Sequence, residues 1–567
     1  MDLIIKNGIL VDGTGNPWIK SDVGVQGEKI VRIGDLYRVQ AEKVIDAKGF
    51  VVSPGFFDIH AHTDYQVLSY PSAKSRIAQG ITTDVSGNCG FSVGPYGKKW
   101  QIDWWVANKP KDEKGENIWV ALWPEAEKIL EDELGIKHSW RTVGEYLSLV
   151  EKHGVGVNYC QLVGHHVLRA AVMGDVIPKP NAEELEEMKN LLDSAMQEGA
   201  FGVSCGFDIK HDVEMSEFIE LGKVVAKYDG IFSNHIRSLD DDVIPAVREA
   251  LEIAEKTQVR TTIAHLLVSG KPNWGKAGTA INMIEEARLN GLEIYLDQIP
   301  FKMGEGNFFI PSLERFLPDW VCKGGSKELV ERLKDPEIRV KVKNEMEQGL
   351  TNKIFTAERY PLKIQPKKTL WEEMLTITFC GENKIYAGRT IAEISRMMGV
   401  DPYDAILNLL ILEGSNVKAS RFGVCDDDLV RIMRYQHTMF GSDGGILEAI
   451  KRPGISHPRQ YGTFPRVLGM YVRERKVLTL EDAIRRMTSL PAQFLRLKDR
   501  GLLREGMYAD ITVFDPKKII DNSSVTEQPS RYAEGIEYVI VNGKMAIEKG
   551  EYTGSLAGKV LRHKVEV

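Results

Sequence analysis

The stretch VVSPGFFDIHAHTD, residues 51–64, decides the fold. It is a short apolar run that ends in two histidines, His60 and His62. Side chains two residues apart on a strand point to the same side, so both imidazoles would leave the end of this strand together. Polar ligands at the C-terminal end of a buried strand are typical of a parallel β/α barrel, whose active site forms at that end.

Seven further apolar runs follow this strand, and amphipathic helices separate several of them. Residues 182–199 and 241–258 carry apolar side chains at the spacing of a half-buried helix. Strands that alternate with helices indicate a parallel sheet, and eight of them in a chain of 567 residues favour an α/β fold of the (β/α)8 TIM-barrel type. The predicted strands are residues 51–59, 81–86, 155–163, 200–205, 231–235, 260–266, 292–297 and 437–442.

The two ends of the chain differ from the middle. Both contain short alternating runs with hairpin turn signals, such as Asn7-Gly8 and Asn542-Gly543. Because chain termini often lie close together, both ends are predicted to form one small β-sandwich domain. Two long stretches break the barrel repeat and are predicted to be lids or binding insertions. The predicted division is a sandwich from residues 1–50 and 470–567, a barrel from 51–469, and insertions at 97–140 and 300–436.

Composition narrows the class of protein. Apolar residues make up 43% and charged residues 27%, which is ordinary for a globular protein, and the net charge of −7 without a dominant basic patch argues against a nucleic-acid partner. No signal peptide opens the sequence, and no apolar window reaches about 20 residues, so no membrane association is expected. The six cysteines are scattered, which is not a disulfide framework and fits a reducing cytoplasm.

Metal-binding residue types gather at the predicted strand ends. Four imidazoles, one thiol and one carboxylate can together bind two borderline-soft divalent ions, for which zinc is the natural choice. Each residue alone could be an ordinary polar side chain, but six such residues at strand ends form a pattern. They are His60 and His62 after the first strand, Cys89 after the second, His235 and His265 at the fifth and sixth, and Asp443 after the eighth.

The sequence resembles the amidohydrolase superfamily and, within it, the D-aminoacylase (N-acyl-D-amino-acid deacylase) family. The resemblance covers nearly the whole chain. PGFFDIHAHTD (54–64) identifies the superfamily, while GITTDVSGNCGFSVGP (80–95) and HPRQYGTFPRVLG (457–469) narrow it to the family. The resemblance implies zinc-dependent hydrolysis of a non-peptide amide bond in a small-molecule substrate, with one or two zinc ions per chain. It leaves the formation of a homo-oligomer open.

The same resemblance implies a role for each metal-binding residue. His60 and His62 match the ligands of the second, weaker metal, and His235 and His265 match the two histidines of the tightly bound zinc. Cys89 matches the cysteine that holds or bridges the metals. Asp443 matches the catalytic aspartate of the eighth strand, which accepts a proton from the activated water and returns it to the leaving nitrogen.

The substrate-binding positions depart from the family pattern. Leu267 stands where the family has a lysine, and the segment from Ile299 to Phe301 stands where it has Tyr-Pro-Tyr. These substitutions remove the cation and hydroxyls that hold the carboxylate of an acyl-D-amino acid, and a buried carboxylate without partners is poorly tolerated. Lys210, Arg237 or Lys271 could compensate. The predicted substrate-binding residues are His165, which ends the third strand, Arg237, Leu267 and Phe301.

Three interpretations of the activity remain open at this level. The first is a zinc amidase that acts on a linear N-acyl compound. The second is a hydrolase of a cyclic amide or an N-substituted formamide, which the altered pocket keeps open. The third is a non-catalytic scaffold, which the complete set of metal ligands disfavours.

Overall fold

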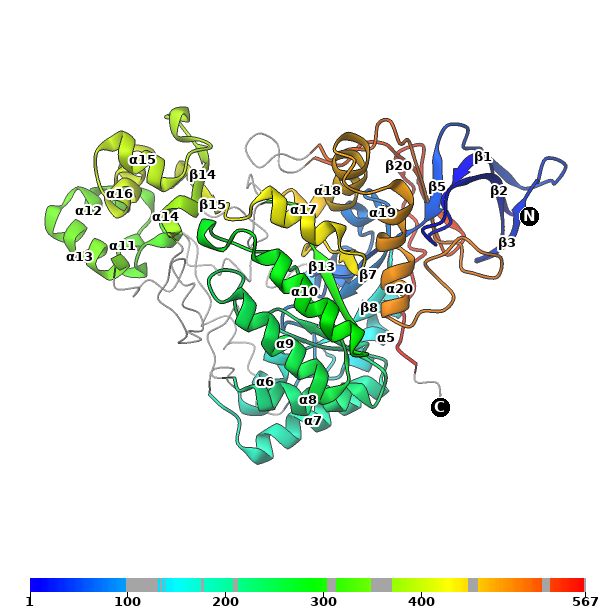
Figure 1. Ribbon diagram of the computed structural model, residues 1–567, viewed down its shortest axis with the longest axis horizontal. Helices are drawn as coiled ribbons and strands as arrows, with labels where there is room; N and C mark the ends of the chain where they lie inside the picture. The colour runs from blue at the N-terminus through cyan, green and yellow to red at the C-terminus, as the bar shows by residue number, and fades with distance from the viewer. Residues whose placement is uncertain are drawn as a thin grey trace.

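The computed structural model describes residues 1–97, 131–132, 135–137, 139–174, 178–206, 213–302, 313–347, 370–446, 457–522 and 531–564. A parallel β/α barrel of the TIM type forms the centre of this part of the chain (Figure 1). Its strands pair in parallel in the order β6-β7-β8 and β9-β10-β11-β12-β13-β16. They are β6 (Phe56–Asp58), β7 (Ile81–Ser86), β8 (Asn158–Gln161), β9 (Val163–Gly164), β10 (Gly202–Cys205), β11 (Ile231–Asn234), β12 (Arg260–Ile263), β13 (Ile294–Gln298) and β16 (Thr438–Phe440).

The ring closes between the first and last barrel strands. Ala61 and Gly444 form a parallel bridge, and the His62 N–H donates to the Gly444 carbonyl at 2.7 Å. The Asp443 N–H donates to the His60 carbonyl at 2.7 Å. The backbone contacts that close the barrel are therefore made by the residues that carry its predicted metal ligands.

The third strand position is divided. β8 pairs with β7 and β9 pairs with β10, with Leu162 between them. Leu162 still donates its N–H to the Ser86 carbonyl at 2.8 Å, so the chain passes from one neighbour to the other without losing its backbone partners. Counted this way, the described residues provide the eight strand positions that the sequence predicts.

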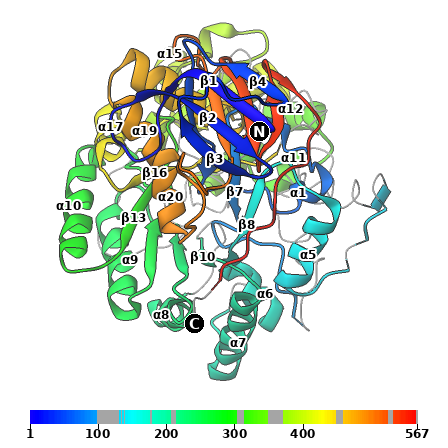
Figure 2. The same cartoon turned by 90° about the vertical axis from the view of Figure 1, so that its right-hand side faces the viewer.

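Helices pack on the outside of the strands (Figures 1 and 2). In α7 an Asn181–Glu184 capping box fixes the start, and Met188, Leu192 and Met196 bury one face at helical spacing. The helices of this layer are α1 (Gln66–Ser69), α2 (Lys74–Ile77), α5 (Val143–His153), α6 (His165–Met173), α7 (Ala182–Gln197), α8 (Met215–Ala226), α9 (Val243–Thr257), η1 (Lys271–Asn273), α10 (Lys276–Leu289), α17 (Asp426–Arg434), α18 (Arg459–Arg466), η5 (Val467–Glu474), α19 (Leu480–Met487) and α20 (Ser489–Phe494).

Strands from both ends of the chain form one hydrogen-bonded sheet beside the barrel (Figure 2). Its order is β20-β19-β18-β17-β5-β1-β2-β3, with β4 paired to β1. A division of this single sheet into two packed layers stays a prediction. The strands are β1 (Leu3–Leu10), β2 (Ile19–Gln26), β3 (Lys29–Gly34), β4 (Lys43–Asp46), β5 (Val51–Pro54), β17 (Ile511–Phe514), β18 (Ile536–Val541), β19 (Lys544–Glu548) and β20 (Glu551–Tyr552).

The predicted strand 51–59 is two strands in different sheets. β5 belongs to the terminal sheet and β6 begins the barrel, with Gly55 between them. The Gly55 N–H donates to the Asp510 carbonyl at 2.9 Å, and a β-carbon at Gly55 would overlap the Thr82 side chain. Only glycine lets the backbone come this close, so the change of sheet occurs there.

The C-terminal segment after residue 470 is not β structure throughout. Helix α19 packs against β16 and β6 of the barrel, and α20 follows it directly. Strands of the terminal sheet resume only at β17. The prediction that the chain from residue 470 onward forms β structure was wrong at α19 and α20. The amphipathic pattern of α19 instead buries Ile484 and Met487 against the barrel.

The described part of the predicted insertion 300–436 has a hydrophobic core of its own (Figure 1, upper left). Leu329, Leu333, Ile377, Ile406 and Leu410 are among its buried residues. An antiparallel hairpin of β14 and β15 lies among its helices. The elements are η2 (Leu313–Phe316), α11 (Asp319–Cys322), α12 (Ser326–Lys334), α13 (Pro336–Glu347), α14 (Trp371–Met374), β14 (Leu375–Cys380), η3 (Lys384–Tyr386), α15 (Ile391–Met398), α16 (Pro402–Glu413), η4 (Gly414–Asn416) and β15 (Val417–Arg421).

Most of the predicted insertion 97–140 lies outside the described residues, including Trp100, Trp104, Trp105, Trp119 and Trp123. Trp140 is described and is buried. Its indole N–H donates to the Val93 carbonyl at 2.7 Å, and its ring lies 5.7 Å from that of Tyr65 and 5.4 Å from that of Tyr146. This tryptophan is part of the main hydrophobic core.

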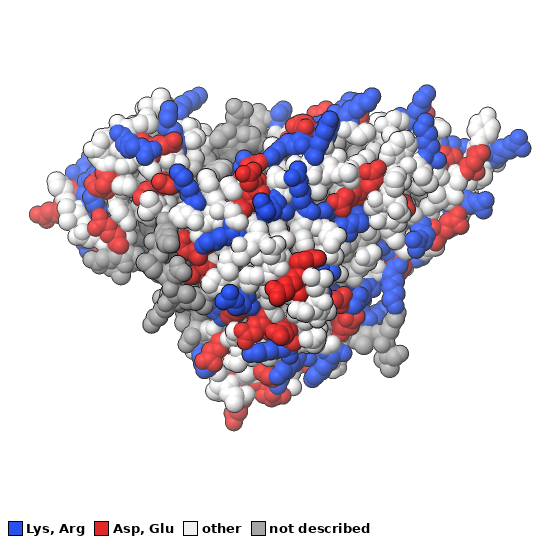
Figure 3. All heavy atoms as spheres, viewed as in Figure 1, with Lys and Arg blue, Asp and Glu red and all other residues white. Residues whose placement is uncertain are grey.

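The surface carries acidic and basic side chains interspersed over the face drawn in Figure 3. Within the described residues, we find no helix with the length and apolar character needed to span a bilayer.

Candidate metal centre

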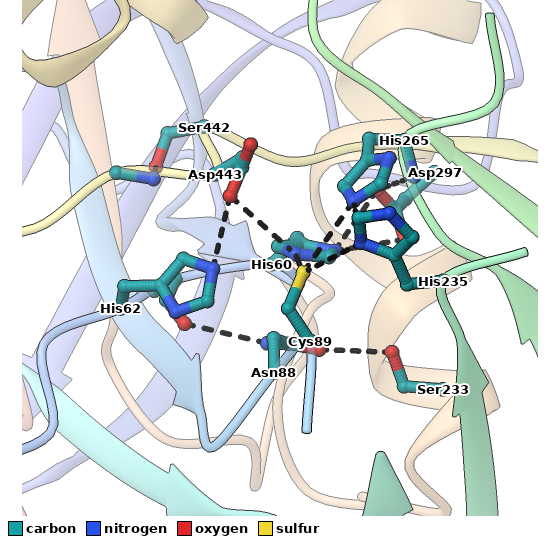
Figure 4. A network of polar contacts seen from close by, with 12 residues as sticks. His60, His62, Asn88, Cys89, Ser233, His235, His265, Asp297, Ser442 and Asp443 are labelled. Atoms are coloured by element: carbon teal, nitrogen blue, oxygen red, sulfur yellow. Dashed lines mark hydrogen bonds and ion pairs between the residues drawn. The ribbon is translucent and has the colours of Figure 1, made fainter. Parts of the chain in front are cut away.

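The structure brings all six predicted metal ligands together at the C-terminal ends of the barrel strands (Figure 4). Their ligand atoms form two groups, each with all atoms within 4.8 Å of one another. One group is Cys89, His235 and His265, and the other is His60, His62, Cys89 and Asp443. Cys89 belongs to both groups, so its sulfur lies between two potential ion sites.

The first group has the dimensions of a tetrahedral zinc site. Cys89 Sγ lies 3.4 Å from both His235 Nδ1 and His265 Nε2, and the two nitrogens lie 3.1 Å apart. Zinc bonds of about 2.0–2.1 Å to nitrogen and about 2.3 Å to sulfur give tetrahedral edges of about 3.3 Å between nitrogens and about 3.6 Å between nitrogen and sulfur. The observed edges agree with these values to within about 0.2 Å, so the residues fit a zinc ion.

The second group is looser and includes the carboxylate. His60 Nε2 lies 3.3 Å from Cys89 Sγ and 3.7 Å from Asp443 Oδ1. His62 Nε2 lies 2.9 Å from the same Asp443 oxygen. A set of two imidazoles, one carboxylate and a shared thiolate can hold a second divalent ion.

Three of these ligands have left-handed backbone conformations that non-glycine residues seldom adopt. The φ angles are +52° at Cys89, +32° at His265 and +48° at Asp443. Such conformations are unfavourable and persist only where the surrounding structure imposes them. Their concentration at one cluster indicates that the fold is organised to aim these side chains at a common point.

Asp297, which sequence reasoning did not select, orients two of the ligands. Its carboxylate lies 3.3 Å from His60 Nδ1 and accepts the His265 N–H at 2.8 Å. A proton on His60 Nδ1 shared with Asp297 leaves the lone pair of Nε2 facing Cys89, which is the tautomer a metal requires. Burial alone would lower the pKa of His60, but the charges of Asp297 and Asp443 outweigh it and hold this pKa above its ordinary value. Asp297 follows the strand-end rule that selected the other ligands, so the signal was present.

Arg459 is the second residue that the sequence analysis missed. It is completely buried at the start of α18, and its Nη1 donates to Asp443 Oδ2 at 2.7 Å. Burial would raise the pKa of Asp443, but the Arg459 guanidinium and the neighbouring His62 outweigh it and hold this pKa well below its usual range. Asp443 is therefore a carboxylate whose Oδ2 is held and whose Oδ1 faces the histidines. In the sequence analysis, Arg459 is only one residue of the motif HPRQYGTF and was not selected as a site residue.

His265 is neutral in this environment. Burial, followed by the proximity of His235 and His60, lowers its pKa to about 3. A neutral imidazole has the free lone pair that a metal ion needs.

A buried ion cluster lies against the strand that carries the two first histidines. The guanidinium of Arg76 pairs with Asp58 and Asp84, and its Nη1 donates to Ser442 Oγ at 3.1 Å. Asp58 Oδ1 in turn accepts the N–H groups of His60 at 3.1 Å and Ser442 at 2.9 Å. This cluster therefore fixes both the His60 backbone and the residue that precedes Asp443.

The predicted substrate-binding residues His165 and Arg237 face acidic partners. His165 lies in the first turn of α6 with Nε2 2.7 Å from Glu217 Oε1, an oxygen that also accepts from Arg169 Nε at 2.8 Å. Arg237 Nε lies 2.8 Å and 2.7 Å from the two carboxylate oxygens of Glu249. Both side chains therefore pair with carboxylates of the barrel. Of the other cations considered, Lys271 is exposed and residue 210 lies outside the described residues.

The apolar residues Leu267 and Phe301 are both buried, with exposed fractions of 9% and 6%. The Phe301 ring lies 5.5 Å from that of His457, and the guanidinium of Arg466 lies 4.5 Å from its centroid. His457 Nδ1 accepts the Arg459 N–H at 3.1 Å, which connects Phe301 to the surroundings of Asp443.

Comparison with known proteins agrees with this site. A model of the amidohydrolase family matches residues 43–214 and 434–547. The D-aminoacylase of Alcaligenes xylosoxydans xylosoxydans is 30% identical over 562 residues, covering 99% of this chain and 97% of that protein. A crystal structure of N-acyl-D-glutamate deacylase from Bordetella bronchiseptica, complexed with zinc and a phosphonate mimic of the tetrahedral intermediate, is 29% identical, covers 99% of each chain and has a TM-score of 0.72. A structure of D-aminoacylase from work on its binuclear metal centre is 30% identical, covers 99% of each chain and has a TM-score of 0.73.

The chain belongs to the amidohydrolase family. Relatives that match it over nearly the full length include a D-aminoacylase, an N-acyl-D-glutamate deacylase and an N-acyl-D-aspartate deacylase.

Proposed function

We propose that this protein is a zinc-dependent amidohydrolase that cleaves the amide bond of a linear N-acyl compound. One observation carries the proposal: Cys89 Sγ is shared by two groups of metal-binding side chains, one of which contains Asp443. The names of two relatives, D-aminoacylase and N-acyl-D-glutamate deacylase, describe reactions of this class. The complete ligand set argues against a non-catalytic scaffold.

Different residues of the chain would bind the metal ions and transfer the proton. His235, His265 and Cys89 would hold one zinc ion, and His60 and His62 with Cys89 and Asp443 would hold a second. Zinc supplies a Lewis acid that polarises a carbonyl group and lowers the pKa of water. Asp443, held at Oδ2 by Arg459, presents Oδ1 as the proton acceptor and then returns the proton to the leaving nitrogen.

Removal of metal tests this proposal. The purified protein is expected to contain one to two zinc ions per chain, and a chelator that removes them should abolish hydrolysis of an N-acyl substrate panel. Addition of zinc should restore it, because the ligands are arranged by the fold and remain in the metal-free protein. Elemental analysis and release of the free amine measure the two quantities. Full activity of the metal-free protein, or hydrolysis restricted to cyclic amides or N-substituted formamides, would overturn the proposal.

Substrate preference is a separate prediction. We expect weak activity on N-acetyl-D-amino acids and better activity on their carboxamide or decarboxylated analogues. Leu267, Ile299 and Phe301 are buried and apolar, and they replace the polar groups that would pair a free carboxylate. The measurement is kcat/KM for each acid and its uncharged analogue on the same enzyme.

The opposite result has a defined meaning. A tenfold or greater preference for the free acid, about 1.4 kcal/mol, would contradict the prediction. It would direct attention to Arg459, the buried guanidinium beside Asp443.

We also propose the organisation and location of the chain. The two ends would form a sandwich from residues 1–50 and the C-terminal strands, a division supported by one apolar cluster that contains Ile5, Val23, Ile511 and Ile540 from both ends. A cytoplasmic location is supported by the fact that none of the six cysteines forms a disulfide bond.

A further inference from the structure

The loop that carries Cys89 leaves β7 after Ser86 and is held by hydrogen bonds from neighbouring strands. Asn88 Nδ2 donates to the Val85 carbonyl at 2.9 Å, and the Phe91 N–H donates to the Asn88 carbonyl at 3.0 Å. The His166 N–H, at the start of α6, donates to the Gly90 carbonyl at 3.0 Å.

Two serines on adjacent barrel strands complete the attachment. Ser204 on β10 and Ser233 on β11 are partners in the strand register. Ser204 Oγ accepts the Gly90 N–H at 3.0 Å and donates to the Gly87 carbonyl. Ser233 Oγ donates to Asn88 Oδ1 at 2.9 Å (Figure 4). The serine pair therefore binds the residues on both sides of Cys89.

Glycines let the loop lie directly against the strand ends. A β-carbon at Gly206 would overlap the Cys89 carbonyl, and one at Gly164 would overlap the Gly90 carbonyl. The loop cannot shift toward β10 or β9 without a clash, and the serine hydroxyls prevent it from shifting away. Ser204 and Ser233 are both buried, with exposed fractions of 0% and 2%, so water cannot easily replace their hydrogen bonds.

We propose that Ser204 and Ser233 are positioning residues for the Cys89 thiolate. By holding this thiolate in place, they would set the affinity of the protein for the metal ions at the two sites that share it. The inference rests on the proposed zinc function. Cys89 has a left-handed backbone, with φ of +52°, which is unfavourable unless its neighbours impose it. The hydroxyls impose it by fixing residues 87, 88 and 90, so Sγ remains within 3.3–3.4 Å of His60, His235 and His265.

The test measures metal binding rather than turnover. In Ser204→Ala, competition with a chelator is expected to give a zinc Kd that is weaker by 10- to 100-fold, the range found when a group that orients a metal ligand is removed. In the cobalt-loaded protein, the absorption band from thiolate to cobalt should lose intensity, because that band reports the sulfur ligand directly. Ser233→Ala removes one side-chain bond instead of two, so it should move both readouts in the same direction by less.

Ser53→Ala is the matched control. Ser53 is also completely buried, and its hydroxyl donates to the carbonyls of Pro54 at 3.1 Å and Thr512 at 3.3 Å in the terminal sheet. The Ser53→Ala substitution should lower the melting temperature by an amount similar to Ser204→Ala but leave the zinc Kd and the cobalt band unchanged.

The outcomes are distinct. If wild-type protein holds zinc and Ser204→Ala and Ser233→Ala both bind it within twofold of wild type with a full cobalt band, the positioning role is wrong and the proposed function stands. If Ser204→Ala does not fold, the Ser233→Ala readouts decide in the same way. If wild-type protein binds no zinc, the proposed function itself fails.

Discussion

Asp443→Asn is expected to lower kcat on any substrate of this enzyme by at least about a hundredfold, in line with the usual contribution of a general acid–base group. The substitution keeps the shape of the side chain and an oxygen that Arg459 can still donate to, but it removes the proton acceptor. Steady-state kinetics and elemental analysis on the same preparation separate loss of proton transfer from loss of metal. A variant that retains most of its kcat would show that another group moves the proton.

Asp510→Asn controls for the loss of a buried charge. Asp510 is 4% exposed, as is Asp443, and it also pairs with a buried arginine, Arg500. It lies at the terminal sheet, where its Oδ1 accepts the Asn542 N–H at 2.8 Å. Removing one partner of a buried ion pair costs stability at either position. Only Asp443→Asn should remove activity in the fraction of protein that remains folded.

Cys89→Ser is expected to lose most of the bound zinc. A serine hydroxyl is a much weaker zinc ligand than a thiolate, and Cys89 is the one residue that both ligand groups share. Both ion sites are therefore weakened by a single substitution, and activity should fall with metal content. Elemental analysis after gel filtration measures the effect.

Cys160→Ser is the matched control for this prediction. Cys160 is completely buried in β8, where burial raises the pKa of its thiol well above the ordinary value, and it packs among apolar residues such as Phe57 and Val85. A hydroxyl there should cost stability without loss of zinc. Undiminished zinc in Cys89→Ser would remove Cys89 from the site and with it the bridging arrangement.

The grouping of the six candidate metal ligands could be predicted because each is a local signal. His60, His62, Cys89, His235, His265 and Asp443 stand at or just after a short apolar run, and strand ends of a barrel converge by geometry alone. The alternation of strands and helices likewise predicted the barrel. The break within residues 51–59 could not be read from hydrophobicity because both halves are buried, although Gly55 marked its position.

The residues that support the ligands could not be found in the same way. Ser204 and Ser233 are single hydroxyls in apolar strands, and their common purpose depends on the register between β10 and β11, which no local pattern specifies. Arg459 reaches Asp443 from a later helix, and nothing in the sequence distinguishes it among 73 basic residues. Asp297 was accessible to the strand-end rule, and its omission was an error of selection rather than of principle.

The junction at Gly55 also implies an order of events during synthesis. β5, immediately before the strand that leads to His60, pairs with β17, so Val51 meets Phe514. While the chain is still being synthesised, β5 can pair only with β1. Its second partner, β17, is synthesised after the strands of the barrel. Contacts between such distant parts of a chain form slowly. We therefore expect a nascent chain that has not reached Ile511 to expose an unpaired strand edge, and the capture of metal to be among the last steps of maturation.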